Sequence, residues 1–186
     1  MKFYISDLHF GHKNAITFDK RPFVDVDEMD KCMIDLWNNK VQNEDEIYII
    51  GDFAYHNTKP EEWYLEQLKG RKYLIIGNHD NRLLKNDIAM QYFEKVDKMM
   101  HVMDGKNHIC LCHFPLAEWN GSRHGSYHIY GHIHSSTNET FQFMKTRERA
   151  FNAGCMINNY APVNFIELEK NNRIFQQKEE LSECIM

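Results

Sequence analysis

The sequence lacks the features that mark several large classes of protein. No run of lysine or arginine appears, and the net charge of -5 leaves no basic field to hold a polyanion. The apolar stretches are only as long as a β-strand, so none would cross a membrane as a helix. No repeat, low-complexity segment or linker interrupts the chain. Basic nucleic-acid tails, transmembrane helices and repeat architectures are therefore not expected.

The cysteines and the first residues predict a reducing environment. The five cysteines are odd in number, and after Met1 and Lys2 only three apolar residues precede Ser6 and Asp7. Such a segment is too short for the apolar core of a secretory signal. We therefore expect free thiols and a cytoplasmic location.

Length and composition predict one globular domain spanning residues 1–186. Apolar residues make up 42% of the chain and charged residues 26%, close to the average for a folded protein. Strand and helix patterns alternate in the first half, whereas the second half reads mostly as strands. We expect an α/β or α+β fold with mixed sheets, in which residues 170–186 form a polar tail or a surface helix.

Apolar periodicity and turn signals predict the individual elements. Helices are expected after Asp25, which stands in a capping box with Glu28, after Pro60, and around residues 83–93. A hairpin turn is expected at Asp104-Gly105. Strands are expected at residues 3–6, 47–50, 73–76, 96–103, 108–112, 127–130, 140–144, 150–153 and 163–168.

Polar side chains follow five of these strands at the point where each strand ends. In open α/β sheets the ligand crevice lies beyond the carboxyl ends of the strands, so we expect the five segments to form one site. Histidine, the commonest metal ligand, occurs 11 times in the chain. The segments are Asp7-Leu8-His9, Gly51-Asp52, Gly77-Asn78-His79-Asp80, His113 and Gly131-His132-Ile133-His134.

The donor types in these segments predict a metal site. Imidazole nitrogens with carboxylate and amide oxygens suit Mn, Fe, Zn, Co or Ni rather than a soft thiolate site. Residues two apart, such as Asp7 and His9, point to the same side of an extended chain. Seven ligands are too many for one tetrahedral ion but suit two ions that share a carboxylate. Such a pair can stabilise both the attacking and the leaving oxygen of a phosphoryl displacement.

The five motifs, in this order, resemble those of the calcineurin-like metallophosphoesterase superfamily over residues 7–134. The resemblance implies a two-sheet sandwich flanked by helices, in four αββα layers, with a dinuclear site at one sheet edge. It implies that Asp52 bridges two divalent ions, Mn first among the expected metals. It also implies that His79 is an uncoordinated general acid, which Asp80 orients. The implied ligands are Asp7, His9, Asp52 and His134 for one ion and Asp52, Asn78, His113 and His132 for the other.

Finer motifs resemble a subgroup of small bacterial and phage phosphoesterases. These motifs are residues 6–14, Arg21-Pro22-Phe23 and residues 119–122. Phe53-Ala54 stands where phosphoprotein phosphatases carry Arg-Gly, and Asp80 stands where they carry Glu. The resemblance therefore favours the phosphodiesterase side of the superfamily.

Six further polar side chains lie near these motifs or could grip a phosphate, and we predict that they contact the substrate. An arginine fork can grip a phosphate. The alternative reading is a helix-start residue for His12 and exposed loop polarity for the other five. They are His12, Arg21, His56, Arg82, Arg123 and His124.

The sequence thus predicts a phosphoesterase that hydrolyses a phosphodiester or a phosphomonoester. A hydroxide bridging the two ions would attack phosphorus, and His79 would protonate the departing oxygen. The substrate is expected to be a small phosphoester or nucleotide, with no membrane partner. Two alternatives remain, a nuclease acting on short single strands and a non-catalytic scaffold of the same fold. The acidic balance argues against strong binding to duplex nucleic acid.

Overall fold

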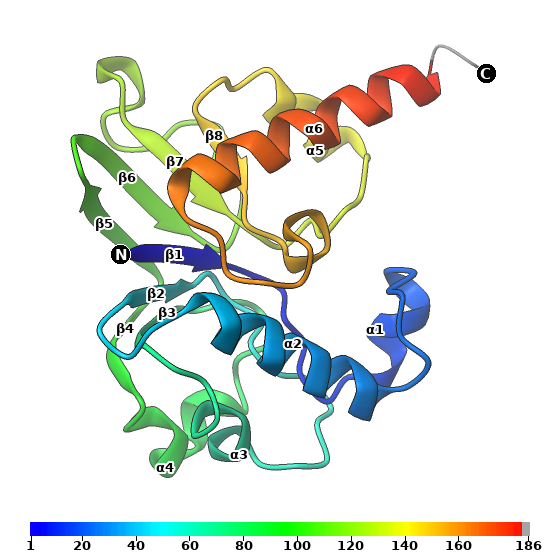
Figure 1. The fold of residues 1–186 in the computed structure, drawn as a ribbon. Helices are drawn as coiled ribbons and strands as arrows, with labels where there is room; N and C mark the ends of the chain where they lie inside the picture. The colour runs from blue at the N-terminus through cyan, green and yellow to red at the C-terminus, as the bar shows by residue number, and fades with distance from the viewer. Residues whose placement is uncertain (184–186) are drawn as a thin grey trace.

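Two four-stranded β-sheets pack against each other and are flanked by helices in the computed structural model, which describes residues 1–183 (Figure 1). The first sheet has the order β1 (Lys2–Ile5), β2 (Glu46–Ile49), β3 (Arg71–Ile75) and β4 (Phe93–Asp97). The second has the order β5 (Met99–Asp104), β6 (Asn107–Cys112), β7 (Tyr127–Tyr130) and β8 (Ala150–Asn152).

The strand directions confirm the sandwich and correct one part of the prediction. Only the second sheet is mixed, with β5 antiparallel to β6 and the other pairs parallel. The four strands of the first sheet are all parallel. An isolated antiparallel bridge between Tyr4 and Val163 lies beside β1. Parallel strands place their carboxyl ends at one edge, which is the edge that carries the site.

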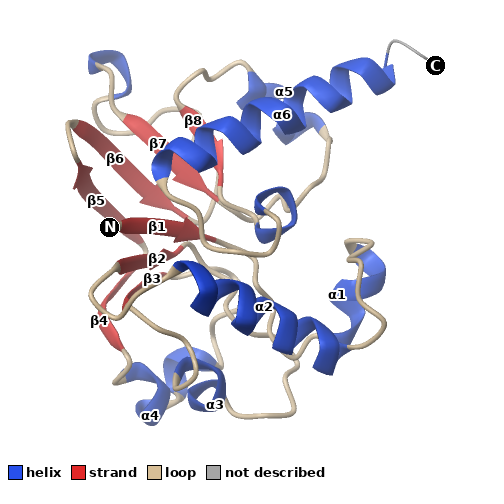
Figure 2. Ribbon diagram, in the orientation of Figure 1, coloured by secondary structure: helices blue, strands red, loops and turns tan. Residues whose placement is uncertain are grey.

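Helices cover the outer faces of both sheets (Figures 1 and 2). The first sheet packs on α2 (Val26–Lys40) and α3 (Glu61–Leu65), with α1 (Lys13–Phe18) and α4 (Asp87–Met90) nearby. The second packs on α5 (Glu139–Lys145) and α6 (Phe165–Glu183). Short 3-10 turns occupy Leu83–Lys85, Ser122–His124 and Cys155–Asn158. No helix among residues 1–183 is long and apolar enough to cross a membrane.

Alternating side chains divide the core into layers. On β1, Phe3 and Ile5 belong to the cluster under the helices of the first sheet, whereas Tyr4 belongs to the cluster between the sheets. The same alternation separates Ile47 from Tyr48 on β2. A strand with both faces buried requires apolar residues at every position, which explains the continuous apolar runs of the sequence.

Several predicted elements differ from the structure. Residues 140–144 are helical rather than extended, because the side chain of Asn138 caps α5 by accepting from the Phe141 N–H. Residues 163–168 enter α6, which a reciprocal pair of hydrogen bonds between Asn164 and Glu167 begins. The strand predicted at 96–103 breaks at Lys98 into β4 and β5, one in each sheet. The helix predicted at 83–93 is a 3-10 turn and α4, and Phe93 already belongs to β4.

The C-terminal prediction is answered in part. Of the two possibilities for residues 170–186, the helix is confirmed as far as Glu183. Residues 184–186, which include Cys184, lie outside the described part of the chain. The other four cysteines are free, as expected.

Candidate metal centre

The turns after five strands converge where the two sheets meet. Figure 2 shows the loops beyond the arrowheads of β1 and β7 running toward the middle of the molecule. Backbone hydrogen bonds tie these turns together, since the Asp7 N–H donates to Gly51 O and the Gly131 N–H donates to His113 O. The expectation that the five polar segments lie at one place in the fold is confirmed.

Strained backbone marks this convergence. Five candidate ligands adopt left-handed φ angles between 50° and 71°, a region that L-residues rarely enter. Strain of this kind persists only where the surrounding structure over-determines it, and it clusters at functional sites. The five residues are Asp7, His9, Asp52, His132 and His134.

Glycines let the turns approach one another. Gly51 has a φ of 81°, as its turn requires. At Gly77 a Cβ would lie 2.3 Å from Asp52 Oδ1, and at Gly131 it would lie 1.8 Å from Ser6 Oγ. Both positions therefore exclude any larger side chain.

Four donors form a first group that could hold a metal ion. One ligand atom from each of Asp7, His9, Asp52 and His134 lies within 4.8 Å of all the others. The Nε2 atoms of His9 and His134 are 3.2 Å apart. Asp52 Oδ2 lies 3.6 Å from His9 Nε2, and Asp7 Oδ1 lies 3.7 Å from His134 Nε2. This is the same set that the family resemblance implies for one ion.

A second group adjoins the first. Asn78 Oδ1 lies 3.0 Å from His113 Nε2 and 2.9 Å from His132 Nδ1. Asp52 Oδ2 is 3.5 Å from His113 Nε2, so this one oxygen faces a histidine from each group. Asp52 therefore lies between the two groups of donors.

The proton positions of these imidazoles fit a cation better than an empty site. His113 Nδ1 lies 2.8 Å from the Ile50 carbonyl, which can only accept, so Nδ1 holds the proton. The lone pair of His113 Nε2 then faces Asn78 Oδ1, another acceptor. In the first group, His134 Nδ1 donates a hydrogen bond to the Asp19 carboxylate. The Nε2 atom of His134 faces the Nε2 atom of His9. The Nε2 lone pairs of His113 and His134 are therefore available to a divalent ion.

Burial makes the same donors costly to leave unpaired. Asp7 and Asp52 are 0% and 1% exposed. Burial raises the pKa of Asp7, although the neighbouring His134 opposes this. Burial and the facing His134 lower the pKa of His9, so that its imidazole is neutral. A neutral imidazole between buried carboxylates is the protonation state that metal binding requires.

His79 lies beside the first group but outside it. Its backbone N–H donates to Asp52 Oδ1 over 2.8 Å, and its ring packs on Tyr55 with centroids 4.1 Å apart. Its centroid is 5.4 Å from that of His9. Within residues 1–183 no hydrogen bond engages the His79 imidazole, which leaves both ring nitrogens available.

Asp80 contacts the backbone of the turns rather than the His79 ring. Its buried carboxylate accepts from the backbone N–H groups of Gly77, Asp52 and Phe53 at 2.7 to 3.0 Å, and not from the His79 ring. Asp80 therefore holds together the two turns that carry Asp52 and His79.

Two hollows meet at His79 and Tyr55. The larger, of about 510 Å³, is lined also by His56, Asn78 and Arg82. The smaller, of about 220 Å³, is lined also by His9, His12, Asp19 and His134. Of the predicted substrate contacts, His12, His56 and Arg82 thus lie at the candidate site.

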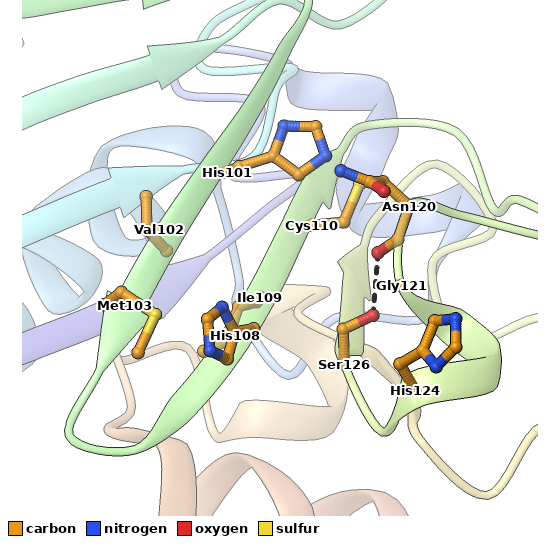
Figure 3. A pocket seen from close by; sticks show the side chains of 10 residues that line it. All are labelled: His101, Val102, Met103, His108, Ile109, Cys110, Asn120, Gly121, His124 and Ser126. Atoms are coloured by element: carbon orange, nitrogen blue, oxygen red, sulfur yellow. Dashed lines mark hydrogen bonds between the residues drawn. The ribbon is translucent and has the colours of Figure 1, made fainter.

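The other three predicted substrate contacts line neither hollow. The Arg21 side chain is fully buried and donates to backbone carbonyls and to Asp19. Arg123 pairs with Glu118 on the surface. Arg123 and His124 precede the amino end of β7, whereas His132 follows its carboxyl end. His124 borders a different hollow of about 390 Å³ near the hairpin of β5 and β6 (Figure 3).

Two residues at the site escaped sequence reasoning. Asp19 contacts His134 from 115 residues away, and Tyr55 packs against His79. Tyr55 follows the Gly-Asp segment by three positions, a proximity that could have drawn attention to it. Nothing in the spacing of Asp19 signals its partner.

Comparison with known proteins identifies relatives of the whole chain. No family model matches it. The chain is 30% identical over 164 residues to the uncharacterized protein MJ1445 of Methanocaldococcus jannaschii, covering 87% of this chain and 85% of the relative. The chain belongs to the family of MJ1445. The Gene 66 protein of Mycobacterium phage D29 is 29% identical over 160 residues, covering 71% of this chain and 77% of that protein.

The fold of this family member also occurs in a solved structure. The protein of unknown function AQ665 from Aquifex aeolicus superposes with a TM-score of 0.72 at 26% identity, covering 91% of this chain and 98% of that one. A novel archaeal phosphodiesterase and the E. coli phosphoesterase Yfce superpose at TM-scores of only 0.42 and 0.37, both at 16% identity. These two likenesses are too distant to support an argument about function.

Proposed function

We propose that this protein is a metal-dependent phosphoesterase that acts preferentially on phosphodiesters. The observation that carries the proposal is the position of Asp52 Oδ2, which lies 3.6 Å from His9 Nε2 and 3.5 Å from His113 Nε2. One carboxylate oxygen facing two groups of converging donors is the arrangement that a bridged pair of ions requires. Paired ions of this kind serve phosphoryl displacement.

The donors divide between two divalent ions, with manganese as the first expectation. Asp7, His9, Asp52 and His134 would hold one ion, and Asp52 would share the second with Asn78, His113 and His132. When bound, these ions supply charge for the phosphate oxygens and a water acidic enough to attack phosphorus near neutral pH. The mixture of nitrogen and oxygen donors suits Mn, Fe, Zn, Co or Ni.

In this proposal His79 protonates the leaving oxygen. A general acid must reach the scissile bond without being a ligand itself. The Asp52 carboxylate anchors the His79 backbone, so the same residue that serves the metals also sets the position of the acid. Tyr55 packs on the imidazole, and Asp80 fixes both turns from below.

The larger hollow supports a small substrate. It extends from Asn78 and His79 to Arg82 with a volume of about 510 Å³, within the range of small-molecule sites. Since it opens beside the proposed acid, it would receive the leaving group of a small phosphoester or nucleotide. The free cysteines among the described residues support the further proposal that the protein works in the reducing cytoplasm.

A metal reconstitution experiment tests the proposal. Protein stripped with a chelator and reloaded with Mn²⁺ should hydrolyse bis(p-nitrophenyl) phosphate faster than p-nitrophenyl phosphate, and the chelator should abolish both activities. Asp52→Asn should lose bound metal and turnover. Asp35→Asn, which changes an exposed carboxylate on α2, should retain both. If the metal-loaded protein hydrolyses neither ester, the proposal is wrong.

A further inference from the structure

Asp19 connects a candidate ligand to a buried arginine. Its Oδ1 accepts from His134 Nδ1 over 2.7 Å, and its Oδ2 accepts from Arg21 Nε and Nη2 over 3.1 and 2.9 Å. Asp19 ends α1, and Lys20 turns the chain with a φ of 52° so that Arg21 can point back toward the site. Both carboxylate oxygens are thereby engaged.

Arg21 continues this connection to the strained turn after β1. Its Nη1 donates to the Leu8 carbonyl over 2.8 Å, and its Nη2 donates to the Asp7 carbonyl over 3.0 Å. Asp7 and His9 flank Leu8 and both have left-handed φ angles. The guanidinium thus satisfies the carbonyls of a turn whose backbone would otherwise relax.

Burial keeps this linkage in one geometry. The Arg21 side chain is 0% exposed and that of Asp19 is 10% exposed. Hydrogen bonds between charged groups away from water are shorter and stronger than neutral ones. Because a carboxylate can only accept, Asp19 holds the proton of His134 on Nδ1 and directs the Nε2 lone pair toward His9.

We propose that Asp19 is a positioning residue for the first ion alone, acting through His134, an inference that rests on the proposed metal-dependent function. A carboxylate behind a ligating imidazole fixes its tautomer and ring plane and increases its basicity. In the second group a different acceptor does this, since the Ile50 carbonyl sets the tautomer of His113. Asp19 therefore affects one of the two ions and leaves the other unchanged.

The tautomer of His134 tests the first step without any metal. In metal-free wild-type protein, ¹⁵N imidazole spectra should show His134 protonated on Nδ1 and bare on Nε2. In Asp19→Ala the proton should redistribute toward Nε2, while His113 keeps its Nδ1 proton. A His134 that carries its proton on Nε2 in the wild type would overturn the inference, even if the variant does not fold.

Metal titration tests the selectivity. Wild-type protein titrated with Mn²⁺ or Co²⁺ should bind two ions, and Asp19→Ala should weaken one of them by roughly 10- to 100-fold. Asp19→Asn, which keeps an acceptor for His134, should weaken the same ion less. The visible spectrum of the Co²⁺ protein should change only for the weakened ion. Asp35→Ala, which removes an exposed carboxylate, should match the wild type.

The outcomes separate this inference from the proposed function. If the wild type binds two ions and Asp19→Ala binds both with wild-type affinity, the inference is overturned and the proposed function stands. If Asp19→Ala weakens both ions equally, the selective role is overturned as well, since that result indicates a general structural effect. If the wild type binds no ion, the proposed function fails, and the tautomer measurement still decides the hydrogen-bonding role of Asp19.

Discussion

His9 Nε2 and His134 Nε2 lie 3.2 Å apart, although their rings come from turns on different sheets. With the His134 proton held on Nδ1, the Nε2 lone pair of His134 faces His9 Nε2. A cation bound here would take the lone pairs of both Nε2 atoms, with the single proton of His9 on Nδ1. Metal binding should stabilise the whole fold because the unfolded chain cannot assemble these donors.

We expect Mn²⁺ to raise the unfolding temperature. A ligand present at 100 times its Kd stabilises the folded state by about 2.7 kcal/mol. For a domain of this length that corresponds to a rise of roughly 5–10 °C. Differential scanning calorimetry with and without Mn²⁺ measures the effect. Asp52→Asn should respond much less, and an equal rise in this variant would place the stabilising ion elsewhere.

His79→Ala should separate metal binding from proton donation. The variant should keep its metal content, since the His79 ring is not among the proposed ligands. Turnover of a diester with a poor alkoxide leaving group should fall by about 10²- to 10⁴-fold, whereas an activated aryl ester should lose much less. His124→Ala, at the opposite end of β7, should leave both rates unchanged. An equal loss on both esters would contradict the role of His79 as the acid.

Gly131→Ala should disrupt the metal site by overpacking the turn that contacts Ser6 and Asp7. The new Cβ would lie 1.8 Å from Ser6 Oγ and 2.8 Å from Asp7 Oδ2, and Ser6 is held by its hydrogen bond to Ile50 O. Overpacking of this kind costs about 1–3 kcal/mol in unfolding free energy, and metal affinity should fall with it. Gly105→Ala provides the control, because its Cβ meets open space and only its φ of 57° is strained, at about 1 kcal/mol. Urea unfolding and metal titration of both variants decide the matter.

Acid should destabilise the protein through His128. This buried side chain accepts from the Leu116 N–H at Nε2 and donates to the Cys110 carbonyl at Nδ1, so it must be neutral when folded. Burial lowers its pKa to about 4, against about 6.5 in the unfolded chain. The folded state therefore binds fewer protons, and the contribution of His128 is complete above pH 6.5 and is lost as the pH falls toward 4.

Comparison of two variants isolates that contribution. The loss due to His128 should approach about 3 kcal/mol between pH 6.5 and pH 4, at about 1.4 kcal/mol per unit. His128→Gln should start less stable at neutral pH and lose less on acidification than the wild type. Urea unfolding in the presence of chelator at each pH measures both curves without a metal contribution. Parallel curves would show that His128 is not the titrating group.

The strands that lead into the site and the turns after them could be predicted from the sequence because two simple signals coincide there. The apolar runs ending at Ile5 and Ile50 have buried side chains on both faces, and a polar residue follows each run within two positions. Residues 140–144 and 163–168 are as apolar as short strands, and their caps at Asn138 and Asn164 decide otherwise. The periodicity of apolar residues alone does not distinguish a short buried helix from a strand.

At the site, too, the sequence predicted some residues and not others. The metal-ligand candidates could be named because they follow strands. Whether an arginine contacts the backbone or lines the hollow depends on the side of the turn on which its side chain packs. Arg21 turns inward to carbonyls, and Arg82 borders the hollow beside His79. The contact between Asp19 and His134 depends on the packing of α1 against a turn of the other sheet, which no local pattern contains.

The distribution of the donors between the sheets has a mechanical consequence. His9 follows a strand of the first sheet and His134 follows one of the second, 125 residues later. An ion held between them would close a very long loop, the situation in which a clip removes the most freedom from the unfolded chain. The ion would then hold the two sheets together at the edge where substrate enters. Amide exchange at the ends of β1 and β7 would slow together on loading, and neither half would open without releasing the other.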